Sequence, residues 1–266
     1  IYTGEDTLSH TTLFRSGVTM THAQPPHSLA GTRLLITGAA GGVGLATARL
    51  CAGLGAELIM TDLHISPALQ SLADSLPHVR AVQACDVSQR LQVEALVNAH
   101  PEISALIDTA GICPYDDDWL APDWNETAFM KVMQVNVLGP MNWARALLPG
   151  MLERGYGRMA FCGSVAGWMG GLRAGAHYAA SKGGVHALVR WLAQRGTPRN
   201  VMINGVAPGV IDTPMTAGHG YQSDTQPMKR FGQPEEIAHV LSFLVSPGAS
   251  FMGGCIVDAN GGILMR

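Results

Sequence analysis

The chain has 266 residues, with 17 Lys and Arg against 20 Asp and Glu, a formal net charge of −3 and charged residues at 14%. Without a basic excess it lacks the positive face that nucleic acids require, and no apolar run approaches the about 18 residues of a membrane-spanning helix. Glycine is the outlier, at 32 residues or about 12% of the chain, where about 7% is usual. This excess indicates that the backbone must approach something closely.

The cysteines give no sign of a disulfide framework or a zinc site. They are odd in number and scattered, and no Cys-x-x-Cys occurs among Cys51, Cys85, Cys113, Cys162 and Cys255. We therefore expect a protein of the reducing cytoplasm.

Residues 1–30 hold no sustained apolar periodicity, so we expect a flexible leader followed by one catalytic domain over residues 31–266. The leader lacks the basic start and apolar run of a secretory signal. Its run Thr11–Ser16 resembles translated vector sequence, which would place the natural start at Met20. N-terminal sequencing of the natural protein tests this.

From Gly31 onward, short apolar runs alternate with segments of helical period. The predicted strands are Arg33–Thr37, Glu57–Asp62, Val79–Ala84, Ala105–Asp108, Arg158–Cys162, Val201–Val206 and Cys255–Val257. The predicted helices are Val43–Leu54, Pro67–Ser75, Gln89–Ala99, Trp124–Leu152, Ala176–Gln194 and Pro234–Val245. This alternation predicts a doubly wound α/β domain of about seven parallel strands, with helices on both faces.

A glycine-rich turn, Gly38–Gly44 (GAAGGVG), joins the first predicted strand to the first predicted helix. Missing side chains let the backbone approach a pyrophosphate, and the N–H groups that open a helix favour its negative charge. No Gly-Lys-Ser/Thr follows, which excludes a P-loop. The turn predicts a dinucleotide site, with a purely structural turn as the alternative.

Asp62 ends the second predicted strand, where a carboxylate can accept hydrogen bonds from both hydroxyls of an adenosine ribose. The same carboxylate would repel a 2′-phosphate, and neither Ala39 nor Ala40 supplies an arginine to hold one. We therefore predict NAD(H) as the cofactor, an ordinary solvated aspartate being the alternative.

Tyr178 and Lys182 lie four residues apart in a predicted helix, so their side chains project from one face. A free tyrosine has a pKa of about 10, and a nearby ammonium stabilises the phenolate and lowers that pKa. A Tyr-x-x-x-Lys pair is often merely structural. Its place after a nucleotide-binding turn favours a general acid/base.

Further motifs follow in order, and together they resemble the short-chain dehydrogenase/reductase family from about Gly31 to Gly262. Besides Tyr178 and Lys182, the matching segments are Thr37-Gly38-x-x-x-Gly42-x-Gly44, Asp86-Val87, Asp108-Thr109-Ala110-Gly111, Val135–Gly139, Gly163–Gly167, and Pro208-Gly209 with Thr213. The helix start Pro234–Ala238 and the last strand are similar to the 3-oxoacyl-carrier-protein-reductase-like branch. The resemblance implies a Rossmann-type fold and NAD(H)-dependent exchange between a secondary alcohol and a ketone.

The resemblance also implies residue roles. Tyr178 would be the general acid/base, Ser164 would hydrogen-bond the substrate oxygen, and Lys182 would lower the pKa of Tyr178 and hold the nicotinamide ribose. Asn136 would position a water that links Lys182 to solvent. Cofactor contacts are implied for Gly38, Gly42, Val43, Gly44, Asp62, Asp86, Val87, Ala110, Gly111, Tyr178, Lys182, Pro208, Gly209 and Thr213. No metal is needed, and similar proteins usually form homotetramers.

Three features depart from the family's pattern. Asp108 and Thr109 replace two asparagines whose hydrogen bonds normally brace the sheet near the cofactor. Gly163 stands where a second serine is common. The interval from Ser164 to Tyr178 is one residue longer than usual, so we expect that loop to bulge.

Specificity must come from loops at the strand ends, and the candidates are residues 112–119, 168–173 and 210–231. Their large side chains favour a mainly apolar small-molecule substrate, with ordinary packing as the alternative: Trp168, Met169, Met215, Tyr221 and Met228. Arg173 either pairs with an anionic group or is simply solvated. We interpret Asp116–Asp118 as a solvated loop rather than a metal site.

A different class of function stays open. A catalytically silent NAD(H)-binding sensor or regulator can have the same fold. Such a protein would have little need for Ser164, Tyr178, Lys182 and Asn136 together, so their joint presence favours an enzyme.

Overall fold

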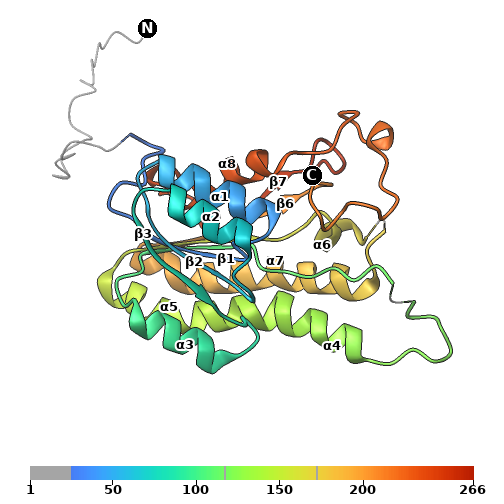
Figure 1. Cartoon of the computed structure of the whole chain (residues 1–266), viewed down its shortest axis with the longest axis horizontal. Helices are drawn as coiled ribbons and strands as arrows, with labels where there is room; N and C mark the ends of the chain where they lie inside the picture. Colours follow the sequence, from blue (N-terminus) through green and yellow to red (C-terminus); the bar gives the residue numbers. More distant parts are fainter. Residues whose placement is uncertain (1–24, 117, 172) are drawn as a thin grey trace, which may run out of the picture.

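The computed structural model describes residues 25–116, 118–171 and 173–266. In this part of the chain seven strands form one parallel sheet in the order β3-β2-β1-β4-β5-β6-β7 (Figure 1). The strands are β1 (Arg33–Thr37), β2 (Glu57–Asp62), β3 (Val79–Ala84), β4 (Ala105–Asp108), β5 (Gly157–Cys162), β6 (Val201–Pro208) and β7 (Ile256–Ala259). The predicted doubly wound architecture is confirmed.

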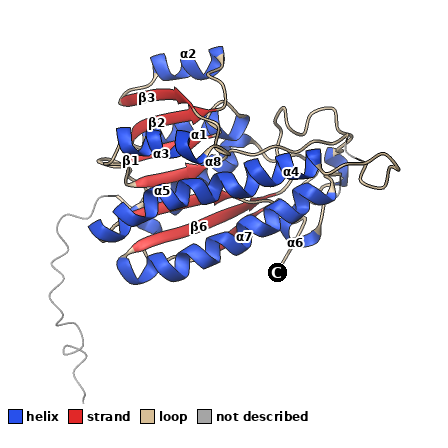
Figure 2. Cartoon of the chain, turned by 90° about the horizontal axis from the view of Figure 1, so that it is seen from below, coloured by secondary structure: helices blue, strands red, loops and turns tan. Residues whose placement is uncertain are grey.

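Helices cover both faces of the sheet, with α1, α2 and α8 on one face and α3, α5 and α7 on the other (Figures 1 and 2). The helices are α1 (Gly42–Gly53), α2 (Pro67–Ser75), α3 (Arg90–Ala99), α4 (Thr127–Met133), α5 (Gly139–Arg154), α6 (Ala166–Met169), α7 (Ala176–Gly196) and α8 (Pro234–Val245). Shorter turns are the π-helical η1 (Gln134–Leu138) and the 3-10 turns η2 (Thr197–Arg199), η3 (Ser223–Thr225) and η4 (Pro247–Ala249). No helix of the described residues is long and apolar enough to span a membrane.

Alternate residues of each central strand serve two separate cores. On β1, Leu35 packs with Trp143 and Phe161 beneath α5 and α7, whereas Leu34 and Ile36 pack beneath α1 and α8. Because both faces of the central strands are covered, these strands have apolar residues at successive positions, as in Leu34, Leu35 and Ile36 of β1.

The predicted helix Trp124–Leu152 is correct in part. The helical run begins at Thr127 and ends at Arg154, and it contains a π-helical turn, η1, between α4 and α5 that was not predicted. The extra residue of a π turn leaves no trace in apolar periodicity, and such turns occur often at functional sites. The predictions also missed α6 and began β7 one residue early.

The predicted leader lies mostly outside the described residues, which begin at residue 25. Within its last six residues, Leu29 is fully buried in the core beneath α1 and α8, and its N–H donates to the Leu54 carbonyl at 2.9 Å. The packed domain therefore includes residues that precede the predicted boundary at Gly31.

Candidate active site

One cavity of about 560 Å³ lies at the carboxyl ends of the central strands. The sheet places it there because β1 pairs with β2 on one side and β4 on the other, so successive crossovers run in opposite directions and leave a crevice. Every predicted catalytic and cofactor-binding residue except Asn136 lines this cavity. Folding thus brings together motifs that span residues 38–213.

The glycine turn approaches its neighbours too closely for side chains. Gly38 has φ +64°, and a Cβ atom there would lie 2.6 Å from the Ala110 backbone nitrogen. A Cβ at Gly44 would overlap the Gly38 carbonyl oxygen. No side chain caps the start of α1, and its first residues, including Gly42, line the cavity. This bare helix N-terminus fits a pyrophosphate.

Asp62 stands at the end of β2 beside this turn. Its carboxylate accepts from the N–H groups of Ala40 at 2.9 Å and Leu63 at 2.7 Å, which fixes its position on the cavity wall. Thr213 faces the turn from the opposite side, since a Cβ at Gly42 would lie 3.0 Å from its methyl group. The residues present therefore fit a dinucleotide.

Hydrogen bonds to neighbouring residues also hold four further predicted cofactor-binding residues in place: Asp86, Val87, Pro208 and Gly209. The Asp86 carboxylate accepts from both the N–H and the hydroxyl of Ser88, and Asn142 donates to the Val87 carbonyl at 2.9 Å. Across the cavity, Pro208 accepts from Val165 at 2.9 Å, and the Gly209 N–H donates to the Ala259 carbonyl at 3.1 Å.

The two departures from the asparagine motif brace the sheet themselves. The Asp108 carboxylate accepts from the Thr37 hydroxyl and from the Ala110 N–H, and the Thr109 hydroxyl donates to the Thr37 carbonyl at 2.7 Å. Both side chains therefore tie β4 to β1. Asp108 is buried, which raises the pKa of its carboxyl above the usual value, whereas the hydrogen bond from Thr37 and the charge of Lys182 oppose that rise.

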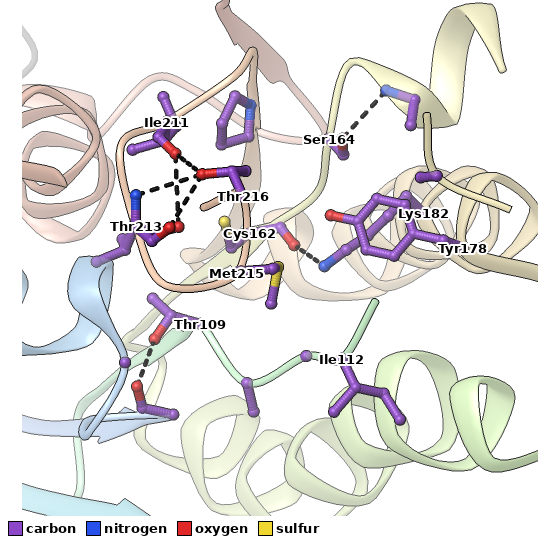
Figure 3. A pocket seen from close by; sticks show the side chains of 18 of the residues that line it. Thr109, Ile112, Cys162, Ser164, Tyr178, Lys182, Ile211, Thr213, Met215 and Thr216 are labelled. Carbon is purple, nitrogen blue, oxygen red and sulfur yellow. Dashed lines mark hydrogen bonds between the residues drawn. The ribbon is translucent and has the colours of Figure 1, made fainter. Parts of the chain in front are cut away.

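Ser164, Tyr178 and Lys182 converge on the cavity (Figure 3). One turn of α7 presents Tyr178 and Lys182 together, with the ammonium 5.6 Å from the centroid of the phenol ring. The same ammonium donates to the Cys162 carbonyl at 2.8 Å, at the end of β5. Ser164 follows β5, and its hydroxyl accepts from the Ala166 N–H at 3.1 Å where α6 begins. Three elements thus position the three side chains.

The pKa of Tyr178 departs from the sequence-based expectation. Burial raises the pKa of the phenol above its ordinary value, because the phenolate loses solvation. The hydrogen bond with Ser164 opposes this rise, and Lys182 is not among the causes of the shift. Ser164 and Lys182 alone therefore do not give Tyr178 the lowered pKa that we expected.

Asn136 lies behind the cavity in the π-helical turn η1. Its amide forms a pair of hydrogen bonds with Ile112, accepting from the N–H at 2.8 Å and donating to the carbonyl at 2.9 Å, and it also donates to the Ser181 hydroxyl at 3.0 Å. These contacts join η1 to the loop after β4 and to α7. The π turn aims this side chain at both elements.

The long interval between Ser164 and Tyr178 contains α6, which the sequence did not indicate. Ser164 stays anchored on both sides, because the Gly163 N–H donates to the Val206 carbonyl at 2.8 Å and Val165 contacts Pro208. Between α6 and α7, Gly170 and Gly171 line the cavity.

Residues of the predicted specificity loops differ in their positions. Met169, Met215 and Tyr221 line the cavity, whereas Trp168, Arg173 and Met228 do not. Residue 117 of the acidic run lies outside the described residues. Sequence analysis did not single out Tyr115, which lines the cavity and packs on His219 with ring centroids 3.8 Å apart. No short-range pattern links two residues that are so distant in the chain.

Comparisons with known proteins identify the family of this chain. A family model described as "Enoyl-(Acyl carrier protein) reductase" matches residues 38–264. The chain belongs to the short-chain dehydrogenase/reductase family. A 3-oxoacyl-[acyl-carrier-protein] reductase from Vibrio cholerae is 35% identical over 90% of this chain and 99% of its own length. Galactitol 2-dehydrogenase from Cereibacter sphaeroides is 36% identical over 88% of this chain and 95% of its own length.

Solved structures of relatives share the architecture. A 3-oxoacyl-[acyl-carrier protein] reductase from Brucella melitensis with bound NAD has a TM-score of 0.80 at 32% identity, covering 93% of this chain and 98% of its own. A dehydrogenase from Agrobacterium tumefaciens with bound NADP has a TM-score of 0.83 at 27% identity, covering 91% of this chain and 100% of its own. The family is thus one of oxidoreductases that use a nicotinamide cofactor, and relatives differ in which one they bind.

Proposed function

We propose that the chain is an NAD(H)-dependent oxidoreductase that interconverts a secondary alcohol and a ketone. The observation that carries the proposal is the convergence of Ser164, Tyr178 and Lys182 on the cavity that the glycine turn and Asp62 also line. A silent sensor would need only the nucleotide end of this cavity, so the second group of residues favours catalysis.

Tyr178 and Ser164 form the proton-handling side of the site. When bound, the nicotinamide cofactor supplies or accepts the hydride at the carbonyl carbon. The Tyr178 phenol gives its proton to the substrate oxygen during reduction and takes it back during oxidation. The Ser164 hydroxyl is a second donor to the same oxygen, which stabilises the negative charge that develops there.

Lys182 is the cation beside Tyr178, with its ammonium 5.6 Å from the centroid of the phenol ring. In the protein alone burial dominates and the pKa of the phenol is raised, so we propose that Lys182 stabilises the phenolate once the bound cofactor and substrate exclude water from the site. Lys182 would also hold the nicotinamide ribose. Asn136 would position a water beside it, since the Asn136 amide oxygen and the Lys182 nitrogen both lie 3.4 Å from the point that a Gly111 Cβ would occupy.

The preference for NAD(H) rests on Asp62. Its carboxylate stands beside the glycine turn and is held there by two backbone N–H groups, so a 2′-phosphate would meet a fixed negative charge. The neighbouring lining residues Ala40 and Leu63 bring no cation. Both facts support discrimination against NADP(H).

A homotetramer in the cytoplasm is the assembly and location that we propose. Three exposed apolar side chains, Met130, Leu138 and Met141, follow one another along α4, η1 and α5, as expected of a surface that a second copy covers. All five cysteines are free, which supports a reducing compartment.

The test is NADH oxidation in the presence of a panel of ketones, with NADPH in parallel. We expect turnover of at least one ketone, faster with NADH. Tyr178→Phe should lower kcat by orders of magnitude while NADH still binds, as measured by cofactor fluorescence. Turnover by Tyr178→Phe at the wild-type rate would refute its role, and a protein that binds NADH but reduces no ketone would be the sensor.

A further inference from the structure

The end of the cavity next to Ser164 and Tyr178 is walled by three loops. The lining residues that these loops contribute are uncharged, among them Ile112 and Tyr115 after β4, Met169 at the end of α6, Gly170, Gly171 and Ala174 between α6 and α7, and Met215 and Tyr221 after β6. The charged lining residues are Asp62, Asp86, Lys131 and Lys182, and none of them belongs to these loops. An anionic group on the substrate would therefore find no partner in these walls.

Two tyrosines from opposite loops meet at this end of the cavity. The hydroxyl oxygens of Tyr115 and Tyr221 lie 3.4 Å apart, and their rings meet edge to face with centroids 6.2 Å apart. His219 stacks on the Tyr115 ring and restrains it. Tyr221 is also near enough to affect the pKa of the Tyr178 phenol. The pair is thus a fixed polar group beside the catalytic tyrosine.

The hydrogen bond between the two hydroxyls uses only one of their two protons, so the other proton can be donated to a further acceptor. Each hydroxyl has one proton, and whichever of Tyr115 and Tyr221 donates to the other, one proton remains. Burial raises the pKa of both phenols, so both stay protonated at neutral pH. Cys113, which also contacts Tyr115, offers only a weak sulfur acceptor. A donor in such an apolar wall is stabilised by an oxygen acceptor.

We propose that Tyr115 and Tyr221 form a second hydrogen-bonding site for the substrate, which is an uncharged ketone or alcohol carrying another oxygen, as a hydroxyl or carbonyl, away from the reacting carbon. This inference rests on the proposed function. Arg173 is a cation close to Tyr221 that does not line the cavity: its guanidinium lies 3.2 Å from the point that a Gly220 Cβ would occupy. It could bind an anionic substrate only by turning inward.

The test compares ketones that differ at one group: cyclohexanone, 3- and 4-hydroxycyclohexanone, and 4-oxocyclohexanecarboxylate. We expect wild-type protein to prefer at least one hydroxyketone to cyclohexanone in kcat/KM by about tenfold, as one neutral hydrogen bond allows. Tyr115→Phe and Tyr221→Phe should each lower kcat/KM for that hydroxyketone more than for cyclohexanone, and so reduce this preference. Tyr156→Phe, a change of the same kind outside the cavity, should leave the preference intact.

Three results would overturn the inference. One is equal kcat/KM for cyclohexanone and both hydroxyketones. Another is a hydroxyketone preference that survives both Phe variants, or an equal loss of kcat/KM on all ketones in these variants. An equal loss would assign the tyrosines a structural role. The third is a preference for the carboxylate that Arg173→Gln abolishes, which would make the substrate anionic.

A binding measurement separates this inference from the proposed function. Tyr178→Phe loaded with NADH is titrated with the same four ketones, with and without Tyr221→Phe, and dissociation constants are read from cofactor fluorescence. A hydroxyketone preference of about tenfold that Tyr221→Phe removes would support the second site even if the wild-type protein reduced none of the ketones. Equal binding of all four would overturn it even if turnover occurred.

Discussion

Gly163 lies against the imidazole of His186, next to Ser164. A Cβ atom at residue 163 would overlap the Nε2 atom of His186. That nitrogen accepts from the Ser164 N–H at 3.4 Å, and the imidazole packs on Trp168 with ring centroids 4.2 Å apart. The bulk of His186 therefore explains why this chain has glycine where the resemblance leads one to expect a serine.

Gly163→Ser should displace His186 and shift Ser164. We expect a loss of about 1–3 kcal/mol in the free energy of unfolding, as overpacking typically costs, together with a lower kcat. Urea denaturation and NADH oxidation measure the two effects.

The double variant Gly163→Ser with His186→Ala is the control for this clash. Removing the imidazole makes room for the serine side chain, so the double variant should be more stable than the sum of the two single changes predicts. Strict additivity of the two losses would show that residues 163 and 186 do not compete for space.

His186 should also make stability depend on pH. Burial lowers the pKa of its imidazole to about 4, and the positive charges of Lys182, Arg190 and Arg266 act in the same direction, against Asp258. The unfolded chain, with a histidine pKa of about 6.5, binds the proton more readily, so stability is lost as pH falls below 6.5.

Between pH 7 and pH 5 this histidine should cost about 2 kcal/mol of unfolding free energy. His186→Gln removes the titrating group and should flatten the dependence by that amount in urea denaturation at pH 5, 6 and 7. Parallel pH profiles for the variant and the wild type would contradict the assignment.

Asp108→Asn should stabilise the protein near neutral pH. Because burial raises the pKa of this carboxyl, the folded state binds its proton more tightly than the unfolded state, and stability decreases as pH rises through the window above the unfolded pKa of about 3.9. Each unit of that increase corresponds to about 1.4 kcal/mol.

Asparagine at residue 108 keeps the oxygen that accepts from Thr37 and Ala110. We therefore expect the gain in unfolding free energy to grow from pH 4 to pH 8, as measured by urea denaturation. Asp108→Ala, which loses the acceptor, should be less stable than the Asn variant at every pH. A constant difference between Asn variant and wild type would argue against a buried titrating carboxyl.

The fold could be predicted from sequence because its strands are buried on both faces. Mainly apolar runs gave β1, β2 and β4 with their observed bounds, and the edge strand β3, which is only partly buried, was also predicted with its observed bounds. The π turn at Gln134–Leu138 could not be predicted, because one inserted residue hardly disturbs a helical apolar pattern. The short helix α6 has too few residues for any periodicity.

The site could be predicted where chemistry depends on local spacing. The glycine turn and the Tyr178 and Lys182 pair are local patterns, and they line one cavity. The contact of Tyr115 with Tyr221 and that of Gly163 with His186 join residues far apart in the chain. The direction of the Tyr178 pKa shift depends on burial, which a spacing of four residues does not reveal.

Asp62→Ala should change cofactor preference. Loss of a charged hydrogen-bond acceptor to the ribose should lower kcat/KM for NADH by about 10- to 100-fold, and removal of the repulsion should raise that for NADPH. Steady-state kinetics with both cofactors measure the ratio of kcat/KM for NADH to kcat/KM for NADPH. Asp74→Ala, a change of the same kind on the exposed side of α2, should leave it unchanged. An unaltered ratio in the Asp62 variant would contradict the proposed NAD(H) selection.

Gly44→Ala and Gly53→Ala make the same change at the two ends of α1, with opposite expected results. At Gly44 the new methyl group meets the Gly38 carbonyl oxygen, so the turn must open. We expect a loss of about 1–3 kcal/mol in stability and of NADH binding, measured by urea denaturation and cofactor fluorescence. At Gly53 nothing lies within 4 Å of the added Cβ, and the helix gains up to about 1 kcal/mol from alanine. Equal effects at both positions would show that the close approach of Gly44 to Gly38 does not limit the turn, because helix propensity alone cannot make the two substitutions differ in sign.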